Sequence, residues 1–301
     1  MKKDRPSLTA AGIAASRAIE SEKPAGERIC YDPYARRFLS GAFYAMTRFF
    51  VNTGYAEKRG PGTIGFLLAR ERYIDDYLQS CLEEGFDQPK LEQTKFVQLV
   101  ILGAGYDSRA YRCAGLKQRV KVFEVDHPAT QQDKVEKLKQ LLGRLPENVV
   151  FVPIDFNTQA LEQRLGEGGY DERLKTVFIW QGVTEYLTSE AVDSTLAFVA
   201  RHSAPGSATI FDYITTSLLD GTVRHDEVTR MQRYRKMTGE GLTFGIPEGT
   251  VEEFLRQRGF DQVQDMPSQK LKEMYFTGAN QDRLVAGGYA IVSARVKGYL
   301  E

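Results

Sequence analysis

A glycine-rich turn followed at a fixed distance by an acidic residue is the first sign of chemistry in this sequence. The apolar run 96–102 leads directly into GAGYDSR at 103–109, and glycines at such a point let a ligand approach the backbone closely. The next apolar run ends in Asp126, 23 positions after Gly103. That spacing suits a carboxylate that holds ribose hydroxyls, with Glu124 as the second choice.

Polar residues also follow the next two apolar runs. Asp155 and Phe156 come after 149–153 and offer a hydrogen-bond acceptor and a ring to an adenine, although Asp155 equally suits a turn or a helix cap. Gln181 opens QGVTEYL after 177–180, a segment that also suits a plain loop. Ligands of open α/β sheets bind at the carboxyl ends of the strands, so the four ends together predict a site for a nucleoside-containing ligand.

The elements that must position these residues alternate between strand-like and helix-like segments. Apolar runs at 96–102, 120–125, 149–153, 177–180 and 208–213 are separated by helix-length stretches. They predict an α/β fold with a Rossmann-like, doubly wound, mostly parallel sheet, completed by a strand at 289–296. Thr188 is expected to cap a helix that runs to His202, and Thr250 with Glu253 to form a capping box.

Two further segments are expected to cover this sheet. Residues 1–92 look helical and include an amphipathic helix over 66–82, so we expect a helical N-terminal cover that contributes to the pocket, followed by a nucleotide-binding domain at 93–301. The main boundary is placed near Glu92. Residues 214–249 interrupt the alternation, and an insertion there would lie above the carboxyl ends of the strands, as a lid.

Composition excludes several classes of partner. Forty basic and forty acidic residues balance, so no overall field attracts nucleic acid or a membrane, although a local patch remains compatible with that balance. No apolar stretch is long enough to span a bilayer, and MKKDRPS lacks a signal-peptide core, which favours a cytoplasmic protein. Cys30, Cys81 and Cys113 fit neither a disulfide framework nor a zinc spacing, so we expect free thiols and no metal.

Several segments together resemble one family of class I methyltransferases. GAGYDSRAYR, EVDHPATQQDK, VPIDF and WQGVTEYL are similar to the leucine carboxyl methyltransferases and polyketide carboxyl O-methyltransferases. TAAGIAASRAIES, YDPYARRFL and LLARERYIDDYL resemble the helical N-terminal region of bacterial members. The resemblance covers most of the chain and implies a class I fold and S-adenosylmethionine as the cofactor.

The resemblance also implies roles for single residues. Arg70 would pair with the cofactor carboxylate, for which a guanidinium is well shaped, although a solvent-facing helical arginine is the alternative. Relatives usually carry Glu where this chain has Gln181, so the contact to the methionine amine would lack an ion pair. The implied cofactor-binding residues are Arg70, Gly103, Ala104, Gly105, Asp126, His127, Asp155, Phe156 and Gln181, with His127 also expected to start a helix.

The acceptor implied by the resemblance is a carboxylate, from a small-molecule acid, a polyketide or a peptide C-terminus. A carboxylate is already ionised near neutral pH, so alignment and exclusion of water would suffice for direct in-line transfer without a general base. Tyr31, Tyr186 and Tyr213 are candidate acceptor-pocket residues, unless they are simply part-buried tyrosines. The alternatives are an NAD-type oxidoreductase, which would normally keep a third glycine near Arg109, and a non-catalytic nucleoside-binding protein. No oligomeric state is predicted.

Overall fold

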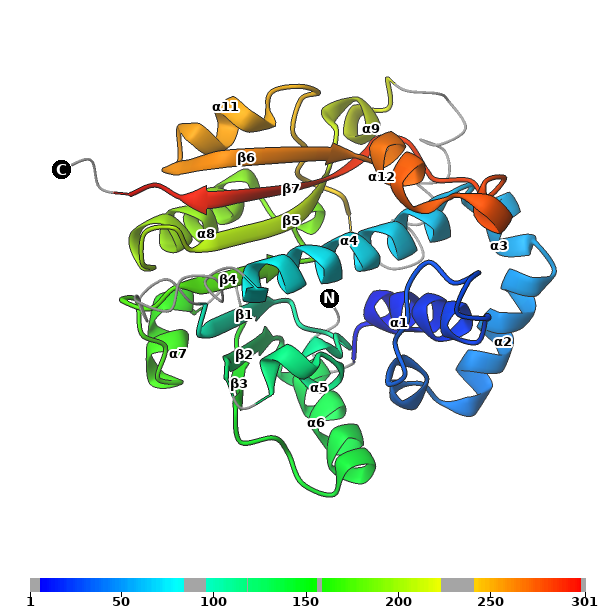
Figure 1. Ribbon diagram of the computed structural model, residues 1–301, viewed down its shortest axis with the longest axis horizontal. Helices are drawn as coiled ribbons and strands as arrows, with labels where there is room; N and C mark the ends of the chain where they lie inside the picture. The colour runs from blue at the N-terminus through cyan, green and yellow to red at the C-terminus, as the bar shows by residue number, and fades with distance from the viewer. Residues whose placement is uncertain (1–5, 84–95, 118, 156–158, 223–240, 299–301) are drawn as a thin grey trace.

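A seven-stranded sheet forms the centre of the computed structural model, which describes residues 6–83, 96–117, 119–155, 159–222 and 241–298 (Figure 1). The strand order is β3-β2-β1-β4-β5-β7-β6, in which β1 to β5 are parallel and β7 is antiparallel to both of its neighbours. The strands are β1 (Gln98–Leu102), β2 (Lys121–Asp126), β3 (Val149–Pro153), β4 (Thr176–Trp180), β5 (Ala208–Ile214), β6 (Phe260–Pro267) and β7 (Tyr289–Val296).

Helices cover both faces of this sheet, because successive side chains of a central strand point to opposite faces. Leu99 and Ile101 of β1 belong to a core shared with α1, α4, α6 and α12, whereas Val100 and Leu102 belong to a core shared with α7, α8 and α11. After the first strand the helices are α5 (Arg109–Arg112), η3 (Ala114–Leu116), α6 (Pro128–Leu142), α7 (Leu161–Glu167), η4 (Thr184–Tyr186), α8 (Ser189–Arg201), α9 (Thr216–Asp220), α11 (Val251–Arg256), α12 (Ser268–Tyr275) and η5 (Gly278–Asn280).

The N-terminal helices pack against the same core rather than forming one of their own. They are α1 (Leu8–Ser21), η1 (Ala35–Phe38), α2 (Gly41–Asn52), α3 (Tyr55–Arg59) and α4 (Thr63–Glu83). Helix α1 begins at Ser7, whose hydroxyl accepts from the Ala10 amide, a normal N-cap. Its far end is tied to the C-terminal part of the chain, since Glu20 accepts two hydrogen bonds from Arg283, at 2.7 and 3.0 Å.

The sequence predictions hold for most of these elements. All six predicted strands are present within about two residues, the predicted amphipathic helix lies inside α4, and the Thr188 hydroxyl caps α8 through the Ala191 amide. The capping box at Thr250 is wrong, because the Thr250 hydroxyl donates to the Pro247 carbonyl and makes no cap. Strand β6 was not predicted. The boundary near Glu92 lies outside the described residues.

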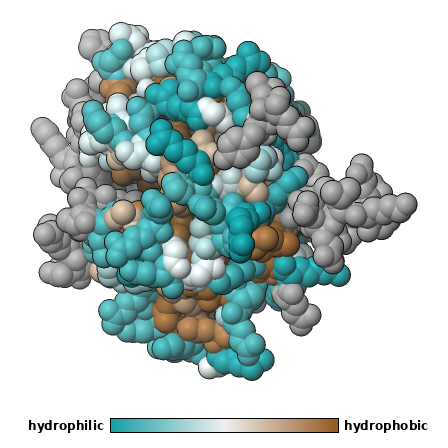
Figure 2. Space-filling view, turned by 90° about the vertical axis from the view of Figure 1, so that its left-hand side faces the viewer, coloured by the Kyte–Doolittle hydropathy of each residue, from teal (hydrophilic) through white to brown (hydrophobic). Residues whose placement is uncertain are grey.

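None of the helices within the described ranges combines the length and the apolar character that crossing a bilayer requires. Figure 2, which views the molecule from the left-hand side of Figure 1, shows a largely hydrophilic face with apolar residues in separate areas. Cys30 and Cys81 are buried, Cys113 is partly buried, and all three are free thiols as predicted.

Candidate active site

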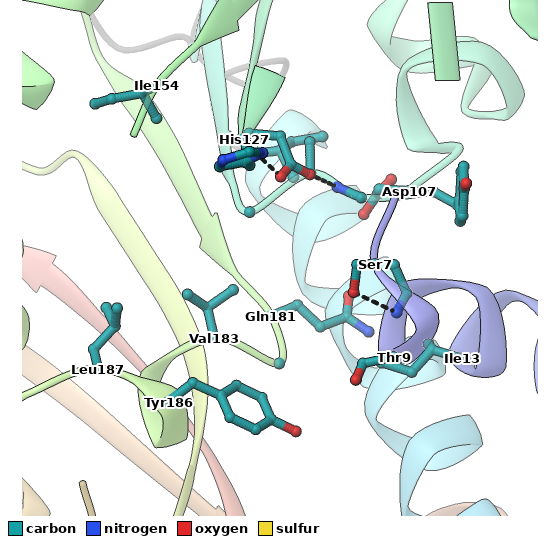
Figure 3. Close-up of a pocket in the computed structure, with 18 of the residues that line it drawn as sticks. Ser7, Thr9, Ile13, Asp107, His127, Ile154, Gln181, Val183, Tyr186 and Leu187 are labelled. Atoms are coloured by element: carbon teal, nitrogen blue, oxygen red, sulfur yellow. Dashed lines mark hydrogen bonds between the residues drawn. The ribbon is translucent and has the colours of Figure 1, made fainter. Parts of the chain in front are cut away.

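A pocket of about 540 Å³ opens at the carboxyl ends of β1 and β4, where the strand order reverses (Figure 3). Crevices at this reversal are the usual ligand sites of open α/β sheets, and the volume is within the range of small-molecule sites. The lining residues come from α1, α4, the ends of β1 to β4 and the segment 241–243. They are Ser7, Thr9, Ala10, Ile13, Arg17, Arg70, Ile101, Gly103, Ala104, Gly105, Tyr106, Asp107, Asp126, His127, Ile154, Asp155, Gln181, Gly182, Val183, Tyr186, Leu187, Gly241 and Thr243.

The glycine turn forms the floor of this pocket, and both of its glycines are required by the backbone. Gly103 and Gly105 have φ of 66° and 42°, in the left-handed region that side chains disfavour. A Cβ at Gly103 would overlap the Val183 side chain, and one at Gly105 would lie 3.2 Å from the Ala10 Cβ on α1. The turn is therefore packed closely on both sides while its backbone faces the pocket.

Asp126 closes the β2 side of the pocket and holds the glycine turn in place. Its carboxylate accepts hydrogen bonds from the Gly105 amide and, at 2.6 Å, from the His127 amide. Burial raises the pKa of Asp126, although the two amides partly oppose this effect. The second-choice residue Glu124 is fully buried, bound to Lys134 at 2.7 Å and to Tyr111 at 2.8 Å, and it does not line the pocket.

Arg70 forms part of the opposite wall of the pocket, and some of its hydrogen-bond donors have no partner among the described residues. The side chain is 2% exposed, and its Nη1 donates to Asp212 on β5, whose other oxygen accepts from the Gly182 amide at 2.6 Å. Its Nε and Nη2 have no hydrogen-bond partner within the described part of the chain. Buried donors are almost always satisfied, so this guanidinium is suited to an anionic ligand group in the pocket.

Glu185 is a second buried carboxyl group in the same region. It lies in η4, and its Oε2 has no hydrogen-bond partner within the described ranges. Burial and the neighbouring Asp212 raise the pKa of Glu185 to about 8, and the attraction of Arg70 only partly offsets this. At neutral pH the group is therefore mostly protonated, which leaves Arg70 and Asp212 as the charged pair.

A cluster of buried charges holds Gln181 at the pocket wall. The Gln181 amide donates to Glu71 Oε2 and accepts from Arg109 Nη1, both at 2.9 Å. Glu71 is also bound by Arg109 at 3.0 Å and by Arg112 at 2.8 Å. Burial alone would raise the pKa of Glu71, but the surrounding guanidinium groups outweigh it and hold that pKa well below its usual value. Gln181 is thus fixed between two ions.

The two ends of the pocket differ in character. In Figure 3, His127 and Ile154 lie at one end, and Tyr186 and Leu187 lie at the other. The Tyr186 ring extends from η4 toward Thr9 on α1, across the space between them. The first end suits a planar heterocycle, and the second offers a partly apolar space beside hydroxyl groups.

Comparison with known proteins identifies the family. A model of the family described as leucine carboxyl methyltransferase matches residues 10–200. The chain belongs to the leucine carboxyl methyltransferase family. A Bacillus subtilis protein named "Putative S-adenosyl-L-methionine-dependent methyltransferase YktD" is 32% identical over 219 residues, covering 73% of this chain and 68% of that protein. A similarly named Mycobacterium tuberculosis protein is 27% identical over 273 residues, covering 84% of this chain and 82% of its own.

The solved structures agree with this family in fold. A "putative methyltransferase" from Thermobifida fusca superposes with a TM-score of 0.56 at 16% identity, covering 98% of this chain and 96% of its own. The CurJ carbon methyltransferase gives a TM-score of 0.50 at 13% identity, covering 96% and 69%. This methyltransferase therefore has the Rossmann-like class I fold that the sequence predicts. The family and the named relatives identify its cofactor as S-adenosylmethionine rather than a nicotinamide nucleotide.

The pocket of this methyltransferase fits that cofactor on two observations. The unsatisfied donors of Arg70 match the carboxylate of the methionine portion, and the turn Gly103-Ala104-Gly105 lines the pocket, so its backbone is accessible to a ligand. Of the residues predicted to bind the cofactor, the structure brings eight to the pocket and leaves Phe156 outside the described residues. The eight are Arg70, Gly103, Ala104, Gly105, Asp126, His127, Asp155 and Gln181.

Two of the three predicted acceptor-pocket tyrosines lie elsewhere in the methyltransferase. Tyr213 is buried in the sheet core and donates to Asp265 of β6 at 3.0 Å, and Tyr31 is 48% exposed with Arg28 stacked on its ring at 3.9 Å. Neither lines the pocket, whereas Tyr186 does. A residue that follows a strand in sequence can still face the core, and Tyr213 does so because β5 continues to Ile214.

The sequence predicted that the N-terminal cover contributes to the pocket, but it singled out none of the α1 residues that do so. These are Ser7, Thr9, Ala10, Ile13 and Arg17. The one signal in the sequence was the charged Arg17 among mostly small residues; in the structure it is buried and donates to Asp32 at 3.0 Å and to the Tyr106 carbonyl at 2.5 Å. In the predicted lid, Gly241 and Thr243 line the pocket, and residues 223–240 lie outside the described residues.

Proposed function

We propose that this methyltransferase transfers the methyl group of S-adenosylmethionine to a carboxylate, which becomes a methyl ester. Candidate acceptors are small-molecule acids, polyketides and peptide C-termini. The family description, leucine carboxyl methyltransferase, supports this acceptor chemistry. The observation that carries the proposal is that the carboxylate and imidazole groups lining the pocket already make hydrogen bonds or ion pairs within the protein.

A hydroxyl acceptor would need a base to take its proton, whereas a carboxylate would not. Asp126 is occupied by two backbone amides and Asp107 by Arg109. His127 Nδ1 accepts from the Ala129 amide at 3.3 Å, so the neutral ring carries its proton on Nε2 and faces a ligand as a donor. With Asp155 assigned to the adenine, the described lining residues offer no carboxylate or imidazole as a base.

Each remaining residue has a role in binding and alignment. When bound, the cofactor supplies an activated methyl group on a sulfonium. Arg70 would hold its carboxylate, Asp126 its ribose hydroxyls, and the 103–105 backbone would lie against the methionine and ribose portion. Val183, Tyr186 and Leu187 would then position the acceptor, and α1 would exclude water, so that alignment rather than proton transfer accelerates the reaction.

The test is the alkali stability of the product. Enzyme and S-adenosylmethionine carrying a labelled methyl group are incubated with a panel of carboxylic acids, phenols and alcohols. A methyl ester releases volatile labelled methanol in mild alkali, whereas an ether keeps its label. Alkali-stable label on a phenol or alcohol would refute the carboxylate assignment, and cofactor binding without transfer to any acceptor would indicate a non-catalytic protein.

A pair of tyrosine variants tests the acceptor end. Tyr186→Phe should change the KM for the acceptor, because its hydroxyl lies at the pocket, and should leave cofactor affinity unchanged. Tyr213→Phe is the matched control, since it removes a hydroxyl bound to Asp265 outside the pocket. Equal effects of the two changes on KM would contradict the placement of the acceptor beside Tyr186.

A further inference from the structure

Helices α2 and α3 carry an unusual concentration of exposed apolar side chains. Nine large apolar residues in the described part of the chain are exposed, and four of them lie between positions 46 and 55. Phe49 is 63% exposed and Met46 50%, and of the twelve residues of α2 only Tyr44 is buried. Scattered exposed apolar residues need no explanation, but a contiguous group indicates an interaction surface.

These side chains form one connected surface, which we call the α2–α3 patch: Met46, Phe49, Phe50 and Tyr55. Phe49 and Phe50 lie three and four positions after Met46, so all three share one face of α2. The Phe49 and Phe50 ring centroids are 5.9 Å apart, and those of Phe50 and Tyr55 are 5.1 Å apart. The apolar area therefore continues from one helix to the next.

The charge around the patch is positive, although the chain as a whole is neutral. Residues 36–59 include five basic residues and one acidic residue. Lys58 and Arg59 on α3 are exposed, and Arg59 lies over the Tyr55 ring at 5.1 Å, whereas Arg48 projects from the other side of α2 and pairs with Glu22 at 3.2 Å. Two acidic residues reduce the positive charge without removing it: Glu57, which accepts from the Gly62 amide, and Glu22.

Exposed aromatic side chains flanked by exposed basic side chains match the surface of an anionic bilayer. We propose that the α2–α3 patch docks this protein reversibly on anionic lipid, with Met46, Phe49 and Phe50 among the acyl chains and the basic residues at the headgroups. A second copy of the chain is disfavoured, because two positive patches would face each other. Figure 1 shows α2 and α3 at the outer edge of the molecule, and a projecting edge suits a deformable surface better than a rigid partner that needs a matching hollow.

Vesicle sedimentation of the whole protein tests the proposal. Binding is measured on phosphatidylcholine vesicles and on equimolar phosphatidylcholine and phosphatidylglycerol vesicles, at low and high salt. We expect stronger binding to the anionic vesicles, and loss of that difference at high salt because the attraction acts within a Debye length of about 10 Å at 0.1 M. Lys58→Gln and Arg59→Gln should each weaken binding about fivefold, whereas Arg48→Gln, on the other side of α2, should change it less.

Matched apolar substitutions distinguish binding through the α2–α3 patch from nonspecific hydrophobic adsorption of the protein. The double variant Phe49→Ser, Phe50→Ser should bind anionic vesicles about tenfold or more weakly, with only a small fall in melting temperature because Phe49 is 63% and Phe50 38% exposed. Met274→Ser, which changes an exposed methionine on α12, should bind like the wild type. The proposal is refuted if the wild type does not bind anionic vesicles, or if the double phenylalanine variant and Met274→Ser bind them equally well. It is also refuted if light scattering shows that the phenylalanines hold two copies of the chain together.

Discussion

Removing the Arg109 side chain should destabilise the protein strongly, because this guanidinium is the centre of the buried charge cluster. It is fully buried and contacts Asp107, Glu71 at 3.0 Å, Asp75 at 2.7 Å and Gln181 at 2.9 Å. Arg109→Met leaves two buried carboxylates, Glu71 and Asp107, and the partly buried Asp75 with less positive charge around them. Breaking one buried ion pair costs about 3–5 kcal/mol, which corresponds to a fall in melting temperature of roughly 6–10 °C.

Urea unfolding at pH 7 and calorimetry would measure this change. The control is Arg173→Met, since Arg173 is largely exposed in its pair with Asp171 and should contribute nothing measurable. A loss below about 1 kcal/mol for Arg109→Met would refute the reasoning, because it would mean that the cost of burying these charges already equals their attraction.

The acid limb of the stability curve provides a second readout of the same variant. The pKa of Glu71 and that of Asp107 are lowered in the folded state, because their guanidinium partners outweigh burial. The unfolded state therefore binds more protons at acid pH, so stability is present above the usual values of 4.5 and 3.8 and is lost as the pH falls below them. Arg109→Met should lose stability less steeply in that window.

Three other predictions concern the pocket. Asp126→Ala should weaken S-adenosylmethionine binding at least tenfold in calorimetric titration, because a charge-assisted hydrogen bond contributes about 1.5–3 kcal/mol; unchanged affinity would remove Asp126 from the site. The pKa of Glu185 is raised in the folded state, so between pH 4.5 and about 8 the folded state keeps a proton that the unfolded state has already released. The free energy of unfolding therefore falls as the pH rises through that window. Glu185→Gln should remove this fall, and parallel wild-type and variant profiles from pH 5 to 8 would contradict it. Gly103→Ala should abolish cofactor binding through overlap with Val183. Gly143→Ala, also at positive φ but in open space, should cost about 1–2 kcal/mol of stability and leave cofactor binding normal.

The sequence predicted the strands that carry the site because each is a short apolar run buried on both faces. Strand β6 was missed because it lies at the edge of the sheet, and in FDQVQDMP only Phe260 is buried. Its backbone also departs from regular pairing at Gln262, which has a positive φ and lies within a register shift. Nothing in the periodicity of such a segment indicates a strand.

The cofactor side of the pocket was more predictable than its other walls. Gly103 and Asp126 follow strands directly, so their place at the sheet edge depends only on the fold class. Gln181 does as well, but its partners Glu71 and Arg109 come from α4 and α5, and no sequence spacing relates them. Contacts of this kind depend on how helices pack across the sheet, which local sequence does not encode.

The contact between Glu20 and Arg283 joins residues 263 positions apart, and it bears on the order in which the pocket is assembled during synthesis. Helix α1 is synthesised well before Arg283, so this contact cannot form until the strands β1 to β6 have been made. The strands between them can pair as they emerge, because domains generally fold from the N-terminal side. A nascent chain arrested before residue 283 should therefore hold the paired strands β1 to β5 but neither the Glu20 contact nor β7, and its cofactor affinity should rise once residues 283–296 have left the ribosome. Measurements of cofactor binding on arrested chains of increasing length would show whether the contact between Glu20 and Arg283 completes the site.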